Sequence, residues 1–379
     1  MHTDILIIGA GPAGFNAAKA ASTSGKKTVL AGSEPWLPYW RPRLPEIIRS
    51  GAPVGGILMQ QAGWYHTAGI EVMTRKTAAR IDTTGKTVFW NDGTTTGYDS
   101  LILACGAASN IPKFPYAEQI HVLRTYEDAL SIRDDCARTG RAFVIGGGVL
   151  GLETAFAIAE TGCKVNVSDI SEYPLPRQLD KEGGLFLQKL LEQKGIRIFC
   201  AVPPEKLKDD IEGACVIAAA GVHASTALAA GCGIKTNRGI IVDSHMKTSE
   251  DTVYACGDVA EFSGIMPGLL TIAAEQGKTA GMNASGTAIE YTPVLPSPSI
   301  KVAGVSVLSL GSMAVPSGAK MYRQSGDGNY AAGVILDGKL TGASFIGDIS
   351  AGMKIRHLME NRTDMSAVAS FADILAMVS

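Results

Sequence analysis

The sequence predicts an α/β protein in which a parallel-sheet unit occurs twice and is followed by a small α+β domain. The first observation is a glycine pattern, G-x-G-x-x-G, which directly follows an apolar run at two places. The second is a composition with 46% apolar residues and 44 glycines, which suits buried parallel strands joined by tight turns. The third is a length of 379 residues, which favours two or three domains over one core.

The first copy of the glycine pattern lies near the N-terminus. We expect a strand over 4–8, a helix over 12–24 and a second strand over 28–30. Small residues on one face of this helix permit close packing on a sheet. The glycine pattern between the strand and the helix comprises Gly9, Ala10, Gly11, Pro12, Ala13 and Gly14.

The second copy begins at Arg141. We expect a strand over 141–145, a helix over 149–161 and a further strand over 164–168. A strand before and a helix after the pattern are the context that makes this motif informative. The second glycine pattern comprises Gly146, Gly147, Gly148, Val149, Leu150 and Gly151.

The glycines of such a motif have separate physical tasks. The first permits a tight turn, the second lets the backbone approach a pyrophosphate, and the third lets the helix pack on the strand. The helix N-terminus then donates N–H groups to the phosphates. Two such Rossmann-like sites in one chain predict two bound dinucleotides and electron transfer between them.

An acidic residue at the end of the second strand of each unit is expected to bind a ribose. Asp169 directly follows the strand over 164–168, and no lysine or arginine stands at 170–176. Its carboxylate accepts ribose hydroxyls and repels a 2′-phosphate, so we expect NADH rather than NADPH there. The alternative is a solvated aspartate at a strand end. In the first unit Glu34 is the expected ribose ligand.

The remaining elements define the domain organisation. We expect the first dinucleotide domain over 1–110 and 240–295, the second over 111–239 and an α+β domain over 300–379, with a proline-rich linker over 291–298. Strands are expected over 78–82, 86–90, 94–98, 101–104, 196–200, 216–220 and 252–255, and helices over 57–68, 178–194, 271–285 and 350–360.

Composition and spacing exclude several functions. A net charge of −2 gives no reason to expect nucleic-acid or membrane binding. The uncharged stretch 214–234 is interrupted by glycine and polar residues, so we expect a buried strand and loop there rather than a membrane span. Seven scattered cysteines and six histidines show no metal-binding spacing, and we expect no metal. Reduced cysteines and the absence of a signal peptide favour a cytoplasmic protein.

The order of the motifs resembles that of the pyridine nucleotide–disulfide oxidoreductase superfamily, over roughly residues 1–290. Within it, the segments 37–44 and 175–180 are most similar to NADH:rubredoxin reductases and related ferredoxin-reductase flavoproteins that lack a redox-active cysteine pair. The superfamily motifs are the glycine patterns at 9–14 and 146–153, Leu101 to Ala107 and Val253 to Asp258.

The resemblance implies FAD in the first site and NADH in the second. It implies that Asp258 binds the ribityl and pyrophosphate region of FAD and that Glu153 lies near the nicotinamide; the alternatives are a strand-terminating turn and a helix-dipole acid. It also implies that Arg41 and Arg43 lie where the chain passes the flavin; the alternative is that they only brace their loop. Further FAD-binding positions implied by the family motifs are Ala104, Cys105, Gly106, Glu275 and Gln276.

One departure from the superfamily decides the expected chemistry. Disulfide reductases carry reactive cysteines shortly after the first unit, but residues 31–58 contain no cysteine. Thiol-based disulfide or peroxide chemistry is therefore not expected. We expect hydride transfer from NADH to FAD, then single-electron transfer to a small acidic iron protein, with rubredoxin the favoured partner.

Docking of an acidic carrier requires a basic face. Such a face is expected on the C-terminal domain, where the alternative is an ordinary solvated helix. Two other functions stay open: a different acceptor (ferredoxin, a flavodiiron protein, a nitrite reductase partner or oxygen) and a non-catalytic signalling module that binds flavin and NADH. The sequence does not define the oligomeric state. The candidate docking residues are Lys354, Arg356, His357 and Arg362.

Overall fold

A computed structural model describes residues 1–117, 119–266, 268–302 and 304–378. The chain forms two compact units. Unit 1 comprises 1–44, 52–108 and 222–294, and unit 2 comprises 45–51, 109–221 and 295–379. No helix within the described residues has both the length and the apolar character needed to cross a membrane.

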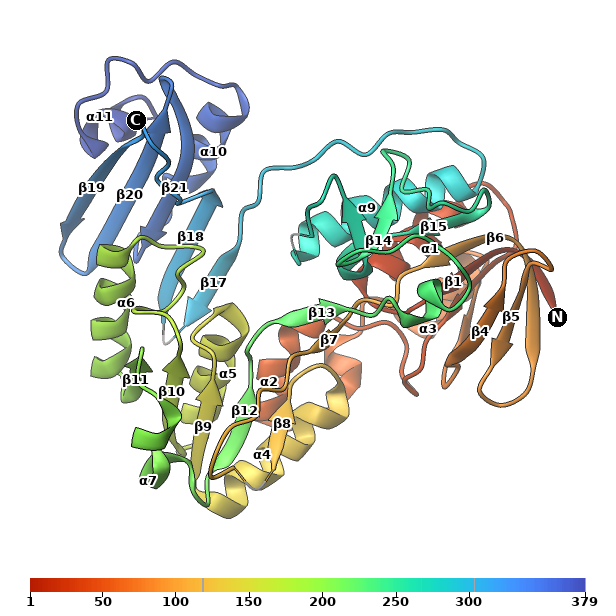
Figure 1. Ribbon diagram of the computed structural model, residues 1–379, viewed down its shortest axis with the longest axis horizontal. Coiled ribbons are helices and arrows are strands. Elements are labelled where there is room, and N and C mark those ends of the chain that lie inside the picture. The colour runs from red at the N-terminus through yellow and green to blue at the C-terminus, as the bar shows by residue number, and fades with distance from the viewer. Residues whose placement is uncertain (118, 267, 303, 379) are drawn as a thin grey trace. The chain divides into compact units, whose positions relative to one another are not determined.

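Unit 1 is organised around a parallel sheet that continues into an antiparallel hairpin (Figure 1). The strand order is β3-β2-β1-β6-β5-β4, and β15 pairs with the last part of β6, on the side opposite β1. The core is apolar on both faces of the central strand, where Ile5, Leu6 and Ile7 are fully buried. The sheet strands are β1 (His2–Ile8), β2 (Thr28–Ala31), β3 (Ile70–Met73), β4 (Ala78–Asp82), β5 (Thr87–Trp90), β6 (Thr95–Leu103) and β15 (Val253–Ala255).

Helices α1 and α9 of unit 1 pack closely because glycines remove side chains from their contact. A Cβ atom on Gly277 or Gly281 of α9 would overlap the carbonyl oxygens of Ala13 and Ala17 in α1. The other elements are α1 (Pro12–Ser22), η1 (Arg41–Arg43), η2 (Val54–Ile57), α3 (Ala62–Thr67), β7 (Ala107–Ser109), β13 (Val222–Ala224), α8 (Ala227–Ala230), β14 (Ile240–Val242), η4 (Gly257–Val259), β16 (Ala260–Phe262) and α9 (Leu270–Ala284).

Unit 2 contains a second parallel sheet, in the order β11-β10-β9-β12-β8. Its strands and helices are α2 (Leu44–Ser50), β8 (Ile120–Val122), α4 (Tyr126–Thr139), β9 (Arg141–Ile145), α5 (Val149–Ala159), β10 (Lys164–Asp169), α6 (Lys181–Gln193), β11 (Ile196–Cys200), η3 (Pro204–Lys206), α7 (Lys208–Ile211) and β12 (Cys215–Ala218).

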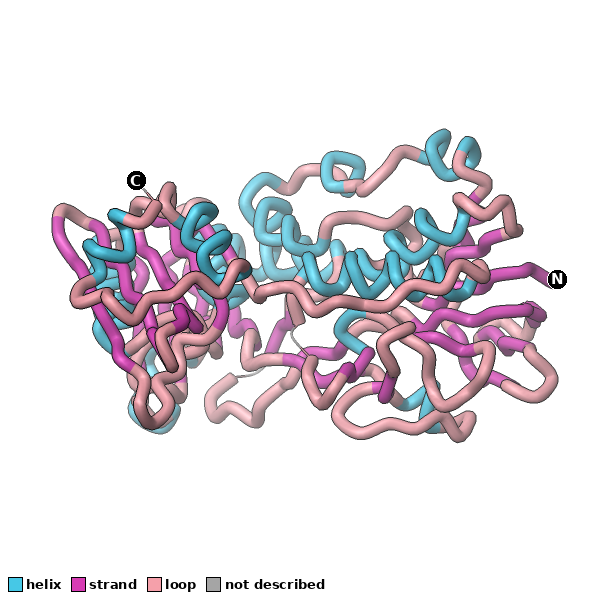
Figure 2. The backbone as a smooth tube through the Cα atoms, turned by 90° about the horizontal axis from the view of Figure 1, so that it is seen from above, coloured by secondary structure: helices cyan, strands magenta, loops and turns pink. Residues whose placement is uncertain are grey.

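The C-terminal part of unit 2 is an antiparallel sheet with two helices, which Figure 2 shows near the C-terminus. Asp180 at the start of α6 joins this part to the parallel sheet, because it accepts hydrogen bonds from Arg323 (2.6 Å) and Tyr330 (2.6 Å). The strand order is β17-β18-β21-β20-β19. The elements are β17 (Ser299–Val302), β18 (Val305–Gly311), β19 (Lys320–Gly326), β20 (Asn329–Leu336), β21 (Lys339–Ile346), α10 (Gly352–Glu360) and α11 (Phe371–Ala376).

Several elements differ from the sequence expectation. The expected strands 94–98 and 101–104 are one strand, β6, because its first part pairs with β5 and its last part lies between β1 and β15. The expected helix over 57–68 is the shorter α3, since Val54–Ile57 forms a separate 3-10 turn. Residues 222–239 lie in unit 1, and 45–51 lie in unit 2, whereas we expected the reverse.

Candidate dinucleotide sites

The loop between β1 and α1 has a backbone that only glycine permits. Gly9 has φ +114°, and a Cβ atom on it would overlap the carbonyl oxygen of Ala104 at the end of β6. A Cβ atom on Gly14 would overlap the carbonyl oxygen of Gly9. Around Gly11 the nearest atom to such a Cβ is the Arg41 Nε, at 3.8 Å. The first and third glycines therefore serve packing, and the second leaves open space at the helix N-terminus.

The loop between β9 and α5 repeats this geometry in unit 2. Gly146 has φ +116°, and a Cβ atom on it would overlap the carbonyl oxygen of Ala219, just after β12. A Cβ on Gly151 would overlap the carbonyl oxygen of Gly146. A Cβ on Gly148 would meet no described atom within 4 Å. Both loops thus present an open cradle where a pyrophosphate can approach the backbone.

The N-termini of α1 and α5 keep their backbone N–H groups free of side-chain caps. Gly11 and Gly148 are the N-cap residues, and neither has a side chain to accept a hydrogen bond. By contrast, Thr125 caps α4 and Asp180 caps α6 through their side-chain oxygens. Uncapped N–H groups beside an open glycine are the donor set that a dinucleotide phosphate requires. The residues present therefore fit a dinucleotide in each unit.

Asp169 lies at the end of β10 and faces the second glycine loop. Its Oδ2 accepts from the backbone N–H of Gly147 (2.6 Å), and its Oδ1 accepts from that of Ser171 (2.7 Å). Each carboxylate oxygen has a further acceptor position, so both remain able to accept a ribose hydroxyl. The contact with Gly147 is a second role, which the strand-end position alone did not indicate.

Glu34 follows β2 and belongs to a small charged cluster beside the first glycine loop. Its carboxylate accepts from the Tyr39 hydroxyl (2.5 Å) and from the Arg41 guanidinium (2.6 Å). The side chain of Glu34 is only 16% exposed. Tyr39 therefore helps to orient the predicted ribose ligand, a contribution that its place in the family-like segment 37–44 did not reveal.

Arg43 differs from Arg41 in its surroundings. Its Nη1 donates to the carbonyl oxygen of Gly56 at 3.0 Å, which links η1 to the end of η2. This contact braces the loop, which is the alternative role that the sequence left open for Arg43. Arg41 instead lies next to Gly11 and Glu34, within the open cradle.

Asp258 lies in η4, directly against the first helix. Gly257 has φ +76°, and a Cβ on it would come within 2.6 Å of the Ala13 Cβ. The Oε1 of buried Gln276 accepts from the Gly257 N–H at 2.9 Å and holds this turn. Gln276 is thus a positioning residue for Asp258, whereas its neighbour Glu275 is exposed on α9.

The segment after β6 completes the rim of the first loop. Cys105 contacts the carbonyl oxygen of Ile8 through its thiol (3.8 Å), and Gly106 has φ +68°. Burial raises the pKa of Cys105 to about 11, so its thiol stays protonated at neutral pH. All seven cysteines are free thiols, and Cys105 has the character of a core residue rather than a nucleophile.

Glu153 lies on α5, one turn beyond the second glycine loop. Burial raises its pKa to about 7, so this carboxyl group changes charge near neutral pH. The structure brings the predicted residues together in two sets. Unit 1 holds those around Gly9 to Gly14, and unit 2 holds Glu153 and Asp169 with Gly146 to Gly151.

Comparisons with known proteins agree with this duplicated architecture. The family model described as pyridine nucleotide-disulphide oxidoreductase matches residues 3–277, and that described as rubredoxin NAD+ reductase C-terminal domain matches residues 296–363. The chain is 42% identical to the NADH-rubredoxin oxidoreductase of Clostridium acetobutylicum, over 98% of each chain. A crystal structure of NADH:rubredoxin oxidoreductase from that organism matches with a TM-score of 0.92 and 41% identity, covering 100% of both chains. The chain is also 32% identical to the assimilatory nitrate reductase electron transfer subunit of Bacillus subtilis, over 89% of this chain and 46% of that protein.

Proposed function

Because the chain belongs to the pyridine nucleotide-disulphide oxidoreductase family, we propose that it is an FAD-dependent NADH:rubredoxin oxidoreductase. The observation that carries this proposal is the 42% identity to an NADH-rubredoxin oxidoreductase over 98% of both chains. The two open glycine cradles support two dinucleotides. The match of residues 296–363 to a rubredoxin reductase domain supports the choice of acceptor.

The residues of unit 1 supply the binding site for FAD in this proposal. The N-terminus of α1 binds the pyrophosphate through backbone N–H groups, with Gly11 allowing close approach. Glu34 binds the ribose, and Arg41 lies beside the phosphates. Asp258, held by Gln276 through Gly257, binds the ribityl and pyrophosphate region.

The residues of unit 2 supply the binding site for NADH. The N-terminus of α5 binds its pyrophosphate, and Asp169 accepts the ribose hydroxyls and disfavours a 2′-phosphate. Glu153 lies near the nicotinamide. When bound, FAD accepts two electrons as hydride from NADH and releases them singly, which adapts a two-electron donor to a one-electron iron acceptor. The protein's own contribution is to bind and orient each dinucleotide in its own unit.

Free thiols throughout the chain support a cytoplasmic location, where cysteines are kept reduced. The same observation, together with the cysteine-free segment 31–58, separates this function from thiol-based disulfide reduction. The proposed function therefore requires no protein dithiol.

The function is tested by anaerobic stopped-flow spectroscopy of the flavin-loaded protein. NADH is expected to bleach the flavin absorption, and oxidised rubredoxin to restore it faster than ferredoxin, a flavodiiron protein or oxygen does. Faster reoxidation by one of those acceptors would replace rubredoxin in the proposal and leave the first half-reaction intact. Failure of NADH to bleach the flavin would overturn the proposal, and slow NADH oxidation with no preferred acceptor would favour a signalling role.

A further inference from the structure

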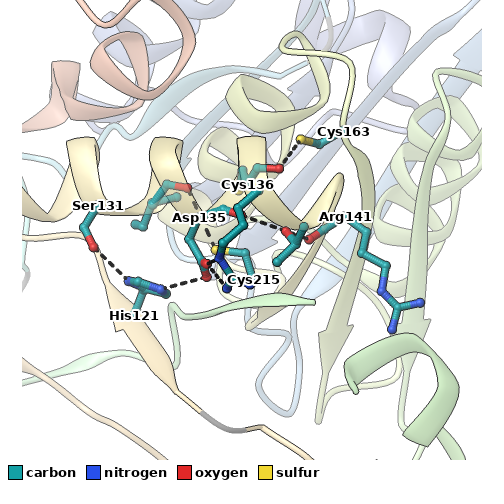
Figure 3. Close-up of polar contacts among 10 residues, drawn as sticks. His121, Ser131, Asp135, Cys136, Arg141, Cys163 and Cys215 are labelled. Atoms are coloured by element: carbon teal, nitrogen blue, oxygen red, sulfur yellow. Dashed lines mark hydrogen bonds and ion pairs between the residues drawn. The ribbon is translucent and has the colours of Figure 1, made fainter. Parts of the chain in front are cut away.

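A histidine, an aspartate and a cysteine meet on one face of the parallel sheet in unit 2 (Figure 3). His121 lies in β8, Asp135 in α4 and Cys215 in β12. His121 pairs with Ile217 in the β8–β12 register, and Cys215 precedes Ile217 by two residues. Side chains two apart in a strand point to the same side of a sheet. The imidazole and the thiol therefore share one face, which α4 covers.

The ligand atoms of these three residues are close enough to share one ion. One imidazole nitrogen, one carboxylate oxygen and the sulfur all lie within 4.8 Å of one another. The His121 Nε2 lies 3.1 Å from the Asp135 Oδ2. Zinc bonds of about 2.0–2.3 Å in a tetrahedron separate neighbouring ligand atoms by roughly 3.3–3.7 Å, so small side-chain adjustments suffice.

The surroundings of the three residues are those of a buried binding site rather than of a cluster of solvent-exposed side chains. The side chains of His121 and Asp135 are 8% and 18% exposed, and Cys215 is fully buried. Ser131 lies 3.5 Å from the His121 Nδ1, on the side of the ring away from Asp135. An outer hydrogen bond of this kind orients a ligating imidazole.

A further buried thiol lies near the three residues. Cys136 is the residue after Asp135 on α4, and its thiol lies near that of Cys215. Cys136 is also buried, with 2% exposure. Imidazole, carboxylate and thiolate form a ligand set that suits a borderline-soft divalent cation.

A cation can reach these ligand atoms if it displaces the Arg138 guanidinium from the Asp135 carboxylate. Asp135 is ion-paired with Arg138, whose side chain is 73% exposed, and exposed ion pairs contribute little to stability. A surface depression of about 580 Å³ includes His121 and Asp135 in its lining, together with the carboxylates of Glu127 and Asp134. Acidic residues at this entrance attract a cation.

We propose that His121, Asp135 and Cys215 form a binding site for a thiophilic divalent cation such as Zn²⁺, in which a water molecule or the nearby Cys136 thiol completes the coordination. The sequence spacing had led us to expect no metal. The ion ties β8, α4 and β12 together at one side of the sheet and serves as a structural brace. It takes no part in electron transfer, so the proposal stands apart from the proposed function.

The test uses the flavin-loaded protein after treatment with a chelator and desalting. Titration with Zn²⁺ in a calorimeter is expected to show one tight site and a raised melting temperature. Asp135→Asn and Cys215→Ser are expected to weaken this binding at least tenfold. Cys163→Ser is the matched control, because this nearby thiol donates to the Cys136 carbonyl oxygen (3.2 Å) and is no proposed ligand.

Each outcome of the titration decides the proposal. Asp135→Asn preserves side-chain shape, and an unchanged rate of flavin bleaching by NADH verifies that each variant is folded. Co²⁺ is a second probe, and its thiolate charge-transfer absorption is expected in the wild type and lost in Cys215→Ser. Absence of tight Zn²⁺ binding, or binding that all three variants retain or lose equally, would overturn the proposal.

Discussion

At the scale of single residues, Asp169 combines two tasks in one carboxylate. It holds the glycine loop through Gly147 and, in our proposal, selects the cofactor through the ribose. Asp169→Arg is expected to lower the ratio of kcat/KM for NADH over NADPH by about tenfold or more, because a cation at this position pairs with a 2′-phosphate. Steady-state kinetics with both cofactors measure this ratio.

The matched control is Asp169→Asn, which removes the charge and keeps an acceptor for Gly147. It is expected to weaken NADH binding without a gain for NADPH. If Asp169→Arg leaves the preference for NADH over NADPH unchanged, another residue determines that preference.

Asp258 is the residue on which flavin retention depends in our proposal. Loss of a charged hydrogen-bond acceptor costs about 1.5–3 kcal/mol, or more than tenfold in affinity. Asp258→Ala is therefore expected to be purified largely colourless, as measured by the flavin-to-protein absorbance ratio. Asp251→Ala, at a 99% exposed side chain, is the control and should stay yellow. A yellow Asp258→Ala protein would remove this residue from the site.

Glu153 predicts a pH dependence of stability. Burial raises its pKa to about 7 from the ordinary 4.5, so the folded protein binds the proton more tightly than the unfolded chain. The free energy of unfolding contributed by this group is highest below pH 4.5 and falls as the pH rises to about 7. With about 1.4 kcal/mol for each pKa unit, the loss reaches at most about 3 kcal/mol.

Glu153→Gln is expected to remove this slope. Relative to the wild type, the variant should gain stability at pH 8 and not at pH 4.5, as measured by urea unfolding. Glu160→Gln, at the end of the same helix, breaks only a partly exposed ion pair with Arg49 and should have a small effect. An equal stability difference at both pH values would contradict the role of buried charge.

At the scale of elements, the contact of α1 with α9 links packing to cofactor binding. Gly277→Val would place side-chain atoms on the carbonyl oxygen of Ala13, within the first glycine motif. Such overpacking costs about 1–3 kcal/mol. We expect a lower melting temperature and a lower flavin content together. Gly63→Ala, where a Cβ meets nothing within 4 Å, should change neither, and a stable, flavin-loaded Gly277→Val protein would refute the coupling.

Elements formed by neighbouring residues were largely predictable, and those formed by distant ones were not. The two strand–glycine–helix units follow from local patterns, since Gly9 and Gly146 need a backbone that glycine permits. The capping box of Thr125 and Asp128 begins α4, a helix we did not predict although its signal is present in the sequence. The continuous β6 depends on pairing with three other strands, which no local pattern encodes.

In the candidate site, too, the residues of one motif were predictable and the residues from distant segments were not. The glycines and Asp169 stand in one motif, and their arrangement followed from it. Tyr39 orients Glu34 only because the loop after β2 folds back on itself. Asp135 and Cys215 are separated in the chain by the strands β9, β10 and β11 and the helices α5, α6 and α7. Spacing rules developed for local metal motifs could therefore not detect the cluster.

At the scale of the whole molecule, the proposed docking of rubredoxin on a basic face predicts that the rate of rubredoxin reduction depends on electrostatic attraction. The proposed basic face on α10 and the turn after it consists of Lys354, Arg356, His357 and Arg362, although Arg356 is paired with Glu360 at 2.8 Å. The second-order rate of rubredoxin reduction is expected to fall as ionic strength rises. Arg362→Glu should lower this rate several-fold at low salt and little at high salt.

Stopped-flow reoxidation at several salt concentrations measures this dependence. Lys235→Glu changes an exposed charge of unit 1 and serves as the control. A rate that is insensitive to salt would exclude electrostatic docking, and equal effects of both substitutions would place the carrier elsewhere.

Unit 1 is assembled from three separate stretches of chain, and its last stretch supplies β15, Asp258 and α9. During synthesis, the first glycine motif leaves the ribosome about 270 residues before the helix that packs against it is complete. The parallel sheet of unit 2 is translated in between and is able to close first. Acquisition of the prosthetic group is therefore a late event in the life of the nascent polypeptide, and truncated chains that end before α9 should emerge without it.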